Sequence, residues 1–272
     1  MKFTFLGTAS CEGIPALFCN CPRCAAARAL GGKNIRTRAQ ALIDDDILID
    51  LPPDTLYHFQ TRGIEGHKLR HLLVTHSHSD HLAPKELHNR GPGRCSNMEI
   101  DVLHVWCSKG SYDAITATAP CEDYVKIHLV KPFEPFTVGK YQVTALPANH
   151  HKGDEAVIYL IVGEKTVLYA HDTHYFHDDV WAYFKEQGVH FDMVSLDCTK
   201  GIDREADYIG HMGAETNLRT RERLIACGAA DEHTVFVANH FSHNGYAPIP
   251  ELEKAMPGFV VSYDGLVLET RK

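Results

Sequence analysis

The sequence predicts an α/β (α+β) fold of four layers, in which two sheets pack together and helices cover their outer faces. Two observations support this prediction. Short runs rich in Val, Ile, Leu, Tyr and Phe recur along the chain with turn residues at their ends, as is typical of strands. The early runs come in hairpin-like pairs, whereas the later ones alternate with helical stretches. Two sheets with outer helices accommodate both patterns.

The predicted strands follow these apolar runs in order. Gly139-Lys140 and Gly163-Glu164 favour hairpin turns between neighbouring runs. The strands are expected at 2–6, 39–43, 47–50, 71–75, 100–106, 124–129, 141–145, 157–162, 166–170, 193–196, 234–238 and 259–262.

Proline marks the beginning of three predicted helices. Pro53, Pro84 and Pro250 suit early helical positions, where a missing backbone N–H is not needed. The helices are expected at 22–30, 53–61, 84–89, 110–119, 177–187, 215–227 and 250–255. No repeat, low-complexity tract or linker divides the chain, so we expect a single domain over residues 1–272.

Composition excludes several classes of protein. No apolar run approaches the roughly 20 residues of a membrane span, and the strand-like start lacks the apolar core of a signal peptide. We therefore expect a cytoplasmic protein whose nine cysteines are reduced thiols or metal ligands. The 27 Lys and Arg against 35 Asp and Glu give a formal charge of -8, which argues against a nucleic-acid partner.

Metal-binding side chains follow one buried strand. A predicted strand ends at Thr75, and His76-Ser77-His78-Ser79-Asp80-His81 comes directly after it. Because the backbone can turn after a strand ends, alternate side chains converge: two histidines can reach one ion, and Asp80 with His81 can reach a second. Imidazole and carboxylate ligands suit zinc, manganese or iron better than magnesium or calcium.

A second group of possible ligands is Cys19-Asn20-Cys21-Pro22-Arg23-Cys24. Three thiols within six residues, tightened by proline, form a compact knuckle suited to structural zinc. A closed tetrahedral site needs a fourth ligand, and no further cysteine lies nearby. A reactive thiol cluster or the remnant of an iron–sulfur site remains an alternative.

The histidine motif resembles the signature of the metallo-β-lactamase superfamily. This resemblance implies a four-layer αββα metallo-β-lactamase-like sandwich with a dinuclear metal site at the edge between the sheets. Asp50 at the end of the predicted strand 47–50 would orient the histidine loop. The remaining motifs of the superfamily match His150, Asp172 and His240, each following a predicted strand.

The resemblance also assigns ligands. His76, His78 and His150 would hold one ion, Asp80, His81 and His240 the other, and Asp172 would bridge them. A water between two such ions becomes a hydroxide nucleophile near neutral pH. Asp80, as a ligand of this centre, is predicted to be a catalytic residue as well. His151 is the alternative to His150, and His171 and His174 are interpreted as supporting or surface residues.

Within the superfamily, the chain resembles the phosphoribosyl cyclic phosphodiesterases of the carbon–phosphorus lyase pathway. The shared features are Gly7-Thr8, Gly13-Ile14-Pro15-Ala16 and the cysteine knuckle. The resemblance implies that His243 completes a structural zinc site with Cys19, Cys21 and Cys24. It also implies that His211 is a general acid and that the protein forms a homodimer. Arg36 and Arg38 are weak candidates for contacts to the substrate phosphate.

These observations lead to one expected function and three alternatives. We expect a metal-dependent hydrolase, in its finer form a phosphodiesterase that cleaves a small cyclic phosphate ester with a metal-bridging hydroxide. It would carry two zinc or manganese ions and one structural zinc. The alternatives are a tRNA 3′-end endonuclease, an acyl hydrolase, and a non-hydrolytic accessory protein of cofactor biosynthesis. Only 22 positions separate His150 from Asp172, which leaves little room for the substrate-clamping insertion of bacterial tRNA endonucleases.

Overall fold

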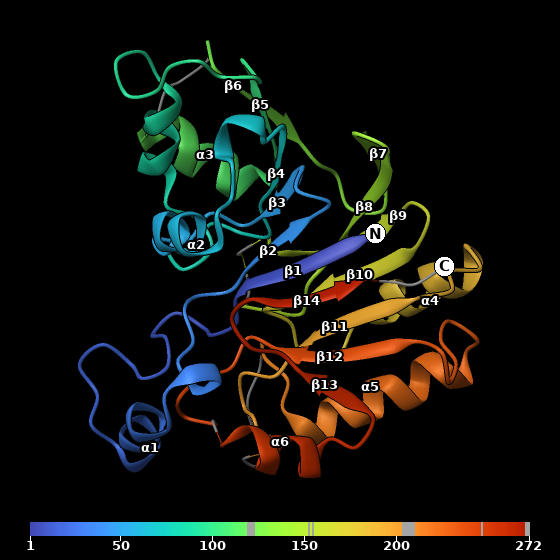
Figure 1. Cartoon of the computed structure of the whole chain (residues 1–272). Helices are drawn as coiled ribbons and strands as arrows, with labels where there is room; N and C mark the ends of the chain where they lie inside the picture. Colours follow the sequence, from blue (N-terminus) through green and yellow to red (C-terminus); the bar gives the residue numbers. More distant parts are fainter. Residues whose placement is uncertain (119–122, 152, 154, 203–209, 246, 270–272) are drawn as a thin grey trace.

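The computed structural model contains two seven-stranded sheets packed face to face (Figure 1). It describes all residues except 119–122, 152, 154, 203–209, 246 and 270–272. The end of the predicted helix 110–119 therefore lies outside the described residues. The predicted fold class is confirmed.

The first sheet is built from the first half of the chain, closed at one edge by the last strand. Its order is β14-β1-β2-β3-β4-β5-β6, and β14 pairs antiparallel with β1. The strands are β1 (Lys2–Gly7), β2 (Gln40–Ile43), β3 (Ile47–Ile49), β4 (His71–Leu73), β5 (Leu103–Cys107), β6 (Val125–Leu129) and β14 (Leu266–Glu269).

The second sheet is built from the second half of the chain in the order β13-β12-β11-β10-β9-β8-β7. Its antiparallel part lies at β7–β10 and its parallel part at β10–β13. The strands are β7 (Pro135–Val138), β8 (Tyr141–Pro147), β9 (Val157–Val162), β10 (Thr166–Ala170), β11 (Met193–Asp197), β12 (Val235–Asn239) and β13 (Phe259–Val261).

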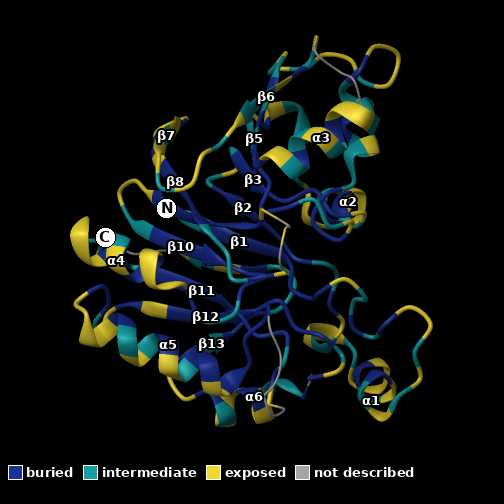
Figure 2. Cartoon of the chain, turned by 180° about the vertical axis from the view of Figure 1, so that it is seen from behind, coloured by how far each residue is buried: buried dark blue, intermediate teal, exposed yellow. Residues whose placement is uncertain are grey.

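Three apolar clusters define the four layers. Phe5, Ile49, Tyr159 and Tyr169 belong to the cluster between the two sheets. The outer face of the first sheet packs against α2 (Thr55–Arg62), η3 (Pro84–Arg90) and α3 (Lys109–Thr118). The outer face of the second sheet packs against α4 (Asp178–Glu186), α5 (Ala214–Ala226) and α6 (Ile249–Ala255). Figure 2 shows the same burial from behind, with dark-blue strands between partly yellow helices.

Three short helical segments remain. In Figure 1, α1 (Pro22–Leu30) stands at the lower left, away from the strands, and its Ala27 belongs to the cluster outside the second sheet. The one-turn segments are η1 (Gly32–Asn34) and η2 (Gly66–Lys68). None of the helices among the described residues is long and apolar enough to cross a membrane.

The structure differs from the predicted elements at several places. The segment predicted as helix 84–89 is a 3-10 helix, with only Leu87 buried along it. The strand predicted at 100–106 begins at Leu103. The strands β7 and β14 were not predicted, because each is only four residues long and is stabilised by its partner strand.

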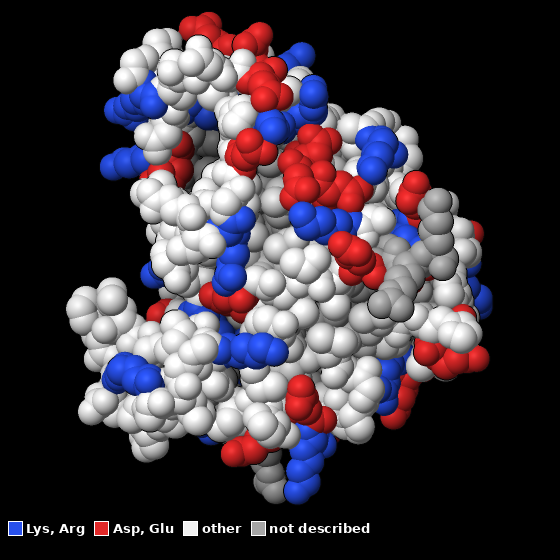
Figure 3. All heavy atoms as spheres, viewed as in Figure 1, with Lys and Arg blue, Asp and Glu red and all other residues white. Residues whose placement is uncertain are grey.

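Surface charge is mixed. On the face seen in Figure 3, Lys and Arg side chains lie among Asp and Glu side chains. Ion pairs among the described residues include Lys140 with Asp44 at 2.8 Å and Lys2 with Asp45 at 3.1 Å. Exposed pairs of this kind contribute little to stability.

Candidate metal centre

The predicted metal ligands meet where strands of both sheets end. Asp50 follows β3, His76 follows β4, and Asp172 and His240 follow β10 and β12. Asp50, Asp172 and His240 have φ values of 66°, 51° and 61°. Such left-handed backbone is uncommon for residues other than glycine and clusters at functional sites. Here it turns the chain at or just after the end of each strand, and the three side chains meet at the ring of His81 and the carboxylate of Asp172.

The first cluster contains His76, His78 and His150, whose ligand nitrogens all lie within 4.8 Å of one another. The ring centroid of His76 lies 4.4 Å from that of His78 and 5.2 Å from that of His150. Nε2 of His76 is buried and has no hydrogen-bond partner. A buried polar atom without a partner is costly, and a metal ion among three imidazoles would satisfy it.

The second cluster surrounds Asp172. Its Oδ2 lies 2.9 Å from Nε2 of His81 and 3.0 Å from Nε2 of His240. Asp80 lies on the same side, 3.3 Å from Nε2 of His81. The other oxygen of Asp172, Oδ1, lies 3.7 Å from Nε2 of His150 in the first cluster. Asp172 therefore contacts both clusters, as a bridging ligand must.

The electrostatics of this centre depend on opposite charges in a buried place. Burial by itself raises the pKa of the Asp172 carboxyl, but His240 and His81 hold it well below its usual range. Burial likewise lowers the pKa of His81, but Asp172, Asp80 and Asp50 raise it well above its usual range. Five imidazoles and two carboxylates form a donor set that suits borderline divalent ions. The buried clusters are consistent with a dinuclear metal site.

Asp50 supports the histidine loop from behind. Its Oδ2 lies 2.7 Å from Nδ1 of His81, and its Oδ1 accepts a hydrogen bond from the backbone N–H of Thr75 at 2.8 Å. The Asp50 side chain therefore fixes the ring of His81 with Nε2 toward the cluster. A carboxylate on the far nitrogen of a histidine ligand is the usual orienting partner at metal sites.

His211 lies in the wall of the same cleft and is held by Asp197 and Thr199. Nδ1 of His211 lies 2.9 Å from Oδ2 of Asp197 and 3.1 Å from Oγ1 of Thr199. The same two residues also hold Nδ1 of His240, at 3.3 Å and 2.9 Å. Burial lowers the pKa of His211, but the charge and hydrogen bond of Asp197 raise it to about 9.

The cysteine knuckle also comes together. Sγ atoms of Cys19, Cys21 and Cys24 lie with a nitrogen of His243 within 4.8 Å of one another. Nδ1 of His243 is 3.6 Å from Sγ of Cys21 and 3.5 Å from Sγ of Cys24. Ligand atoms on a tetrahedral zinc ion lie about 3.5 Å apart, given bond lengths of about 2.0–2.3 Å. This group could bind a structural metal.

Hydrogen bonds stabilise the thiolate form of one cysteine in this cluster. Cys21 is the N-cap of α1, and its Sγ accepts a hydrogen bond from the backbone N–H of Cys24. That hydrogen bond, together with His243, lowers the pKa of the Cys21 thiol to about 6. A thiol with a lowered pKa is largely thiolate at neutral pH, the form that binds metal.

Three residues that the sequence analysis did not select support these sites. Asp197 and Thr199 hold His211 and His240, as described above. Glu12 connects the two sites: its Oε1 lies 3.6 Å from Nε2 of His243 and accepts a hydrogen bond from Ser242, and the side chain lines the cleft. Asp197 ends a buried strand just as Asp50 does, and that shared pattern could have identified it.

The remaining candidate residues lie as follows. His151 is exposed at the rim of the cleft, whereas His150 is buried in the first cluster. His171 is buried, with Nε2 2.8 Å from Oγ of Ser195, and therefore supports the fold next to Asp172. His174 is half-buried, and its backbone N–H donates to the carbonyl of Asn149.

Arg36 and Arg38 do not line the cleft. Arg36 is buried, donates to the carbonyl of Ser262 and lies over the ring of Phe241. Arg38 pairs with Asp54 at 3.0 Å. Arg38 also donates to the carbonyl of Cys11, which lines the cleft. Both arginines thus have structural partners within the fold, and their weak candidacy as phosphate contacts gains no support from the lining of the cleft.

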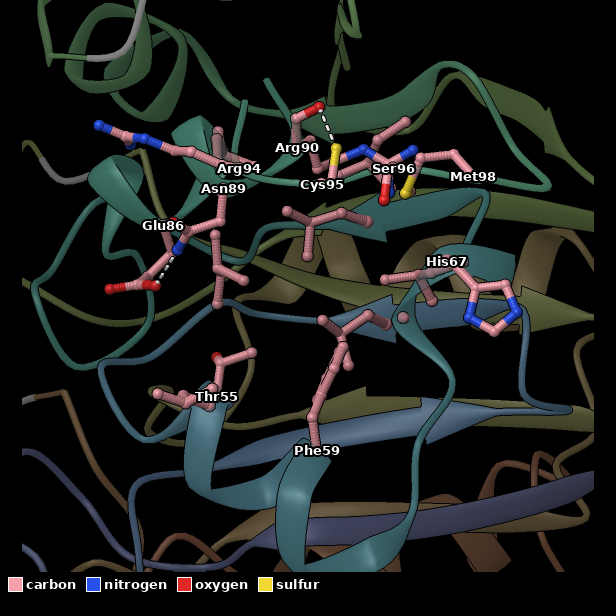
Figure 4. A pocket seen from close by; sticks show the side chains of 18 residues that line it. Thr55, Phe59, His67, Glu86, Asn89, Arg90, Arg94, Cys95, Ser96 and Met98 are labelled. Atoms are coloured by element: carbon pink, nitrogen blue, oxygen red, sulfur yellow. Dashed lines mark hydrogen bonds between the residues drawn. The ribbon is translucent and has the colours of Figure 1, made fainter. Parts of the chain in front are cut away.

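The cleft over the metal clusters has a volume of about 310 Å³ and is lined by polar side chains, among them Glu12, Asp80, His211 and Lys200. A larger cavity of about 500 Å³ lies elsewhere, on the outer face of the first sheet between α2 and η3. Figure 4 shows Thr55 and Phe59 of α2 below it and Cys95 above it. Seven of the 18 residues that line that cavity are leucines, and none of the predicted metal ligands lines it. The smaller cleft is the one that the predicted ligands line.

The fold is shared with solved structures of low sequence identity. A diphosphatase of the PhnP family matches with a TM-score of 0.76 and 20% identity over 99% of this chain and 98% of that chain. Zinc-bound PqqB from Methylobacterium extorquens matches with a TM-score of 0.73 and 18% sequence identity. The match covers 99% of this chain and 100% of that chain. The short form of human tRNase Z matches with a TM-score of 0.67 and 14% sequence identity, over 99% of both chains. A comparison with curated protein sequences found no match.

One family model matches the sequence directly. It describes a β-lactamase superfamily domain and matches residues 46–241, which include Asp50, the histidine loop, Asp172 and His240. The matched part thus contains both buried clusters and most of the two sheets. The chain belongs to the metallo-β-lactamase superfamily.

Proposed function

We propose that this protein is a metal-dependent phosphodiesterase that hydrolyses a small, cyclic phosphate ester. The observation that carries the proposal is the position of His211, a histidine with a raised pKa that faces the cleft beside Asp172. An alkoxide that leaves from phosphate gains from a nearby proton donor, and His211 is placed to be that donor.

The two clusters fit two divalent ions. One ion would be held by His76, His78 and His150. The other would be held by Asp80, His81 and His240, and Asp172 would bind both ions. Zinc or manganese ions there would polarise the phosphate and activate a water for attack. The Cys19, Cys21, Cys24 and His243 group would hold a structural zinc.

Residues around the proposed metal site would orient its ligands, donate a proton and attract the substrate. Asp50 and Asp197 orient His81, His240 and His211 through the nitrogens that point away from the cleft. His211 would give its proton to the leaving oxygen and then recover one from solvent. Lys200 also lines the cleft and would attract the negatively charged substrate.

The size and charge of the cleft support a small substrate. Its volume of about 310 Å³ is near the lower end of small-molecule sites. The formal charge of -8 and the mixed surface in Figure 3 do not favour binding to a long polyanion. The similar fold of a PhnP-family diphosphatase supports chemistry at phosphorus, and that of human tRNase Z keeps the endonuclease as the alternative.

A substrate panel tests the proposal. Metal-stripped protein refilled with zinc or manganese would be assayed on a cyclic ribose phosphate, bis(p-nitrophenyl) phosphate, a nitrocefin-type lactam, an acyl thioester and a tRNA precursor. We expect turnover of the two phosphate diesters and none of the lactam or thioester. Preference for the tRNA precursor would favour the endonuclease, and no turnover of any substrate by fully loaded protein would favour an accessory role.

We also propose that the protein forms a homodimer. Leu17 and Phe18, which precede the cysteine knuckle, are 76% and 98% exposed. Large exposed apolar side chains are often covered in an assembly. Sedimentation of the unmodified protein beside Phe18→Ser tests this: a dimer that becomes monomeric on substitution supports it, and a monomer in both contradicts it.

A further inference from the structure

A buried hydrogen-bond network reaches Asp50 from β2 and α2. In the antiparallel pair of β2 and β3, Ala41 is opposite Ile49, which places Gln40 beside Asp50. Nε2 of Gln40 donates to the backbone carbonyl of Asp50 at 2.9 Å and to Oγ1 of Thr55, the first residue of α2, at 3.0 Å. Gln40 is completely buried, so its amide depends on these hydrogen bonds to offset the loss of water.

His58 of α2 holds the other end of the Gln40 amide. Because Nε2 of Gln40 donates to a carbonyl, Oε1 is the end that faces His58, and it lies 2.6 Å from Nδ1 of that ring. Nδ1 of His58 therefore carries a proton and donates it to Oε1. Nε2 of His58 lies 2.6 Å from Oγ1 of Thr37. Both ring nitrogens have partners, and the buried side chain is held in one orientation.

The backbone of Asp50 has a conformation that needs such support. Its φ is 66°, in the left-handed region that residues other than glycine rarely adopt. Backbone of this kind persists only where the surrounding structure fixes it. The N–H of Asp50 donates to the carbonyl of Leu73 at 2.8 Å, and Gln40 holds the carbonyl of Asp50. Both polar backbone groups are thus fixed where the Asp50 carboxylate reaches Nδ1 of His81, at 2.7 Å.

We propose that Gln40 and His58 are positioning residues for the proposed metal centre. Through the carbonyl of Asp50 they fix the carboxylate that orients His81, and with it the nitrogen that would bind an ion. Neither Gln40 nor His58 lines the cleft, so their effect passes through Asp50. The proposal rests on the dinuclear site of the proposed function, and it extends the support of that site to β2 and α2.

Zinc binding tests the proposal without any substrate. Unmodified protein, Gln40→Met and His58→Leu would be dialysed against buffers of fixed free Zn²⁺, and metal per chain would be measured by elemental analysis. Both variants remove the hydrogen bonds of the network and keep an apolar side chain in its place. We expect the ion at His81 to need about 10–100-fold more free Zn²⁺, the loss typical when an outer partner of a metal ligand is removed. Zinc in the cysteine knuckle should bind equally in all three proteins.

Two further variants separate positioning from a general loss of stability. His58→Asn keeps an N–H donor near the place of Nδ1, so it should restore zinc binding that His58→Leu loses. Thr234→Val removes a buried hydrogen bond to the carbonyl of Phe191, outside the network, and should lower the Tm without weakening zinc binding. Thermal melting shows whether each variant is folded. If Gln40→Met does not fold, the comparison of His58→Leu with His58→Asn decides the question.

The outcomes separate this proposal from the proposed function. Zinc binding that is equal in unmodified protein, Gln40→Met and His58→Leu would overturn the role of the network. Equal weakening in His58→Asn and His58→Leu, or in Thr234→Val, would overturn it as well, because zinc binding would then follow packing or stability. A failure of the proposed function looks different: unmodified protein would bind fewer than two ions besides the zinc of the cysteine knuckle.

Discussion

Nδ1 of His211 lies 2.9 Å from Oδ2 of Asp197, at the end of a strand that also supports the metal centre. The same carboxylate accepts hydrogen bonds from the backbone N–H groups of Asp172, Thr199 and Met212. Asp197 therefore fixes the position of the proposed acid relative to the proposed bridging ligand. It also supplies the negative charge that raises the pKa of His211.

Replacing His211 by Ala should lower turnover while leaving the metals in place. The expected loss is about 10²–10⁴-fold, the usual contribution of general acid catalysis. It should be largest for a cyclic ribose phosphate, whose alkoxide leaves poorly without a proton, and smaller for bis(p-nitrophenyl) phosphate. Steady-state kinetics and elemental analysis measure both effects, with His233→Ala as the control. Equal losses on both esters would assign His211 to phosphate binding, and loss of metal would make it a ligand.

Replacing Asp197 by Asn should change the pH profile. A general acid works in its protonated form, so activity falls as pH rises through its pKa. Asp197 holds the pKa of His211 at about 9, and removing its charge should move the alkaline limb of kcat/KM to lower pH by about 1–3 units. The measurement is the pH dependence of hydrolysis of a cyclic ribose phosphate.

Metal content must accompany this profile, because Asp197 also contacts His240. A shifted limb at unchanged metal content supports the role of Asp197 as a positioning residue. An unchanged limb would mean that a group other than His211 delivers the proton.

The sequence predicted the local part of the metal centre well. His76, His78, Asp80 and His81 lie within one loop directly after a strand, so their convergence follows from the chain itself. His150, Asp172 and His240 came from the resemblance, and the structure brings them to the same place. Their roles as ligands stay predictions until metal is measured.

The supporting residues were harder to predict because their roles depend on distant contacts. Glu12 reaches Ser242 and His243 across 230 positions of sequence. The strand β14 was missed for the same reason, since it is stabilised by pairing with β1 at the other end of the chain. Arg36 was a weak candidate for a substrate contact in the sequence, and tertiary packing buries it beside Phe241.

Replacing Cys21 by Ser should lower thermal stability and remove one zinc. Metal bound to thiolates is coupled to folding, and each kcal/mol lost lowers the Tm of a chain of this size by about 2–4 °C. Calorimetry and elemental analysis measure the effect. Cys227→Ser is the matched control, because Cys227 is exposed and lies outside the cluster. An unchanged Tm and zinc content in Cys21→Ser would show that the knuckle is not a structural metal site.

Replacing Asp172 by Ala should empty the paired site while sparing the knuckle. Asp172 contacts both clusters, and its negative charge offsets the repulsion between two cations held close together. Elemental analysis of unmodified protein should approach three metals per chain, at least one of them zinc. In Asp172→Ala it should approach one zinc, and turnover should be lost. Asp178→Ala, which removes a fully exposed carboxylate, should keep all three. A ceiling of one metal in unmodified protein under saturating conditions would contradict the dinuclear assignment, and retention of both cleft metals in Asp172→Ala would contradict the bridge.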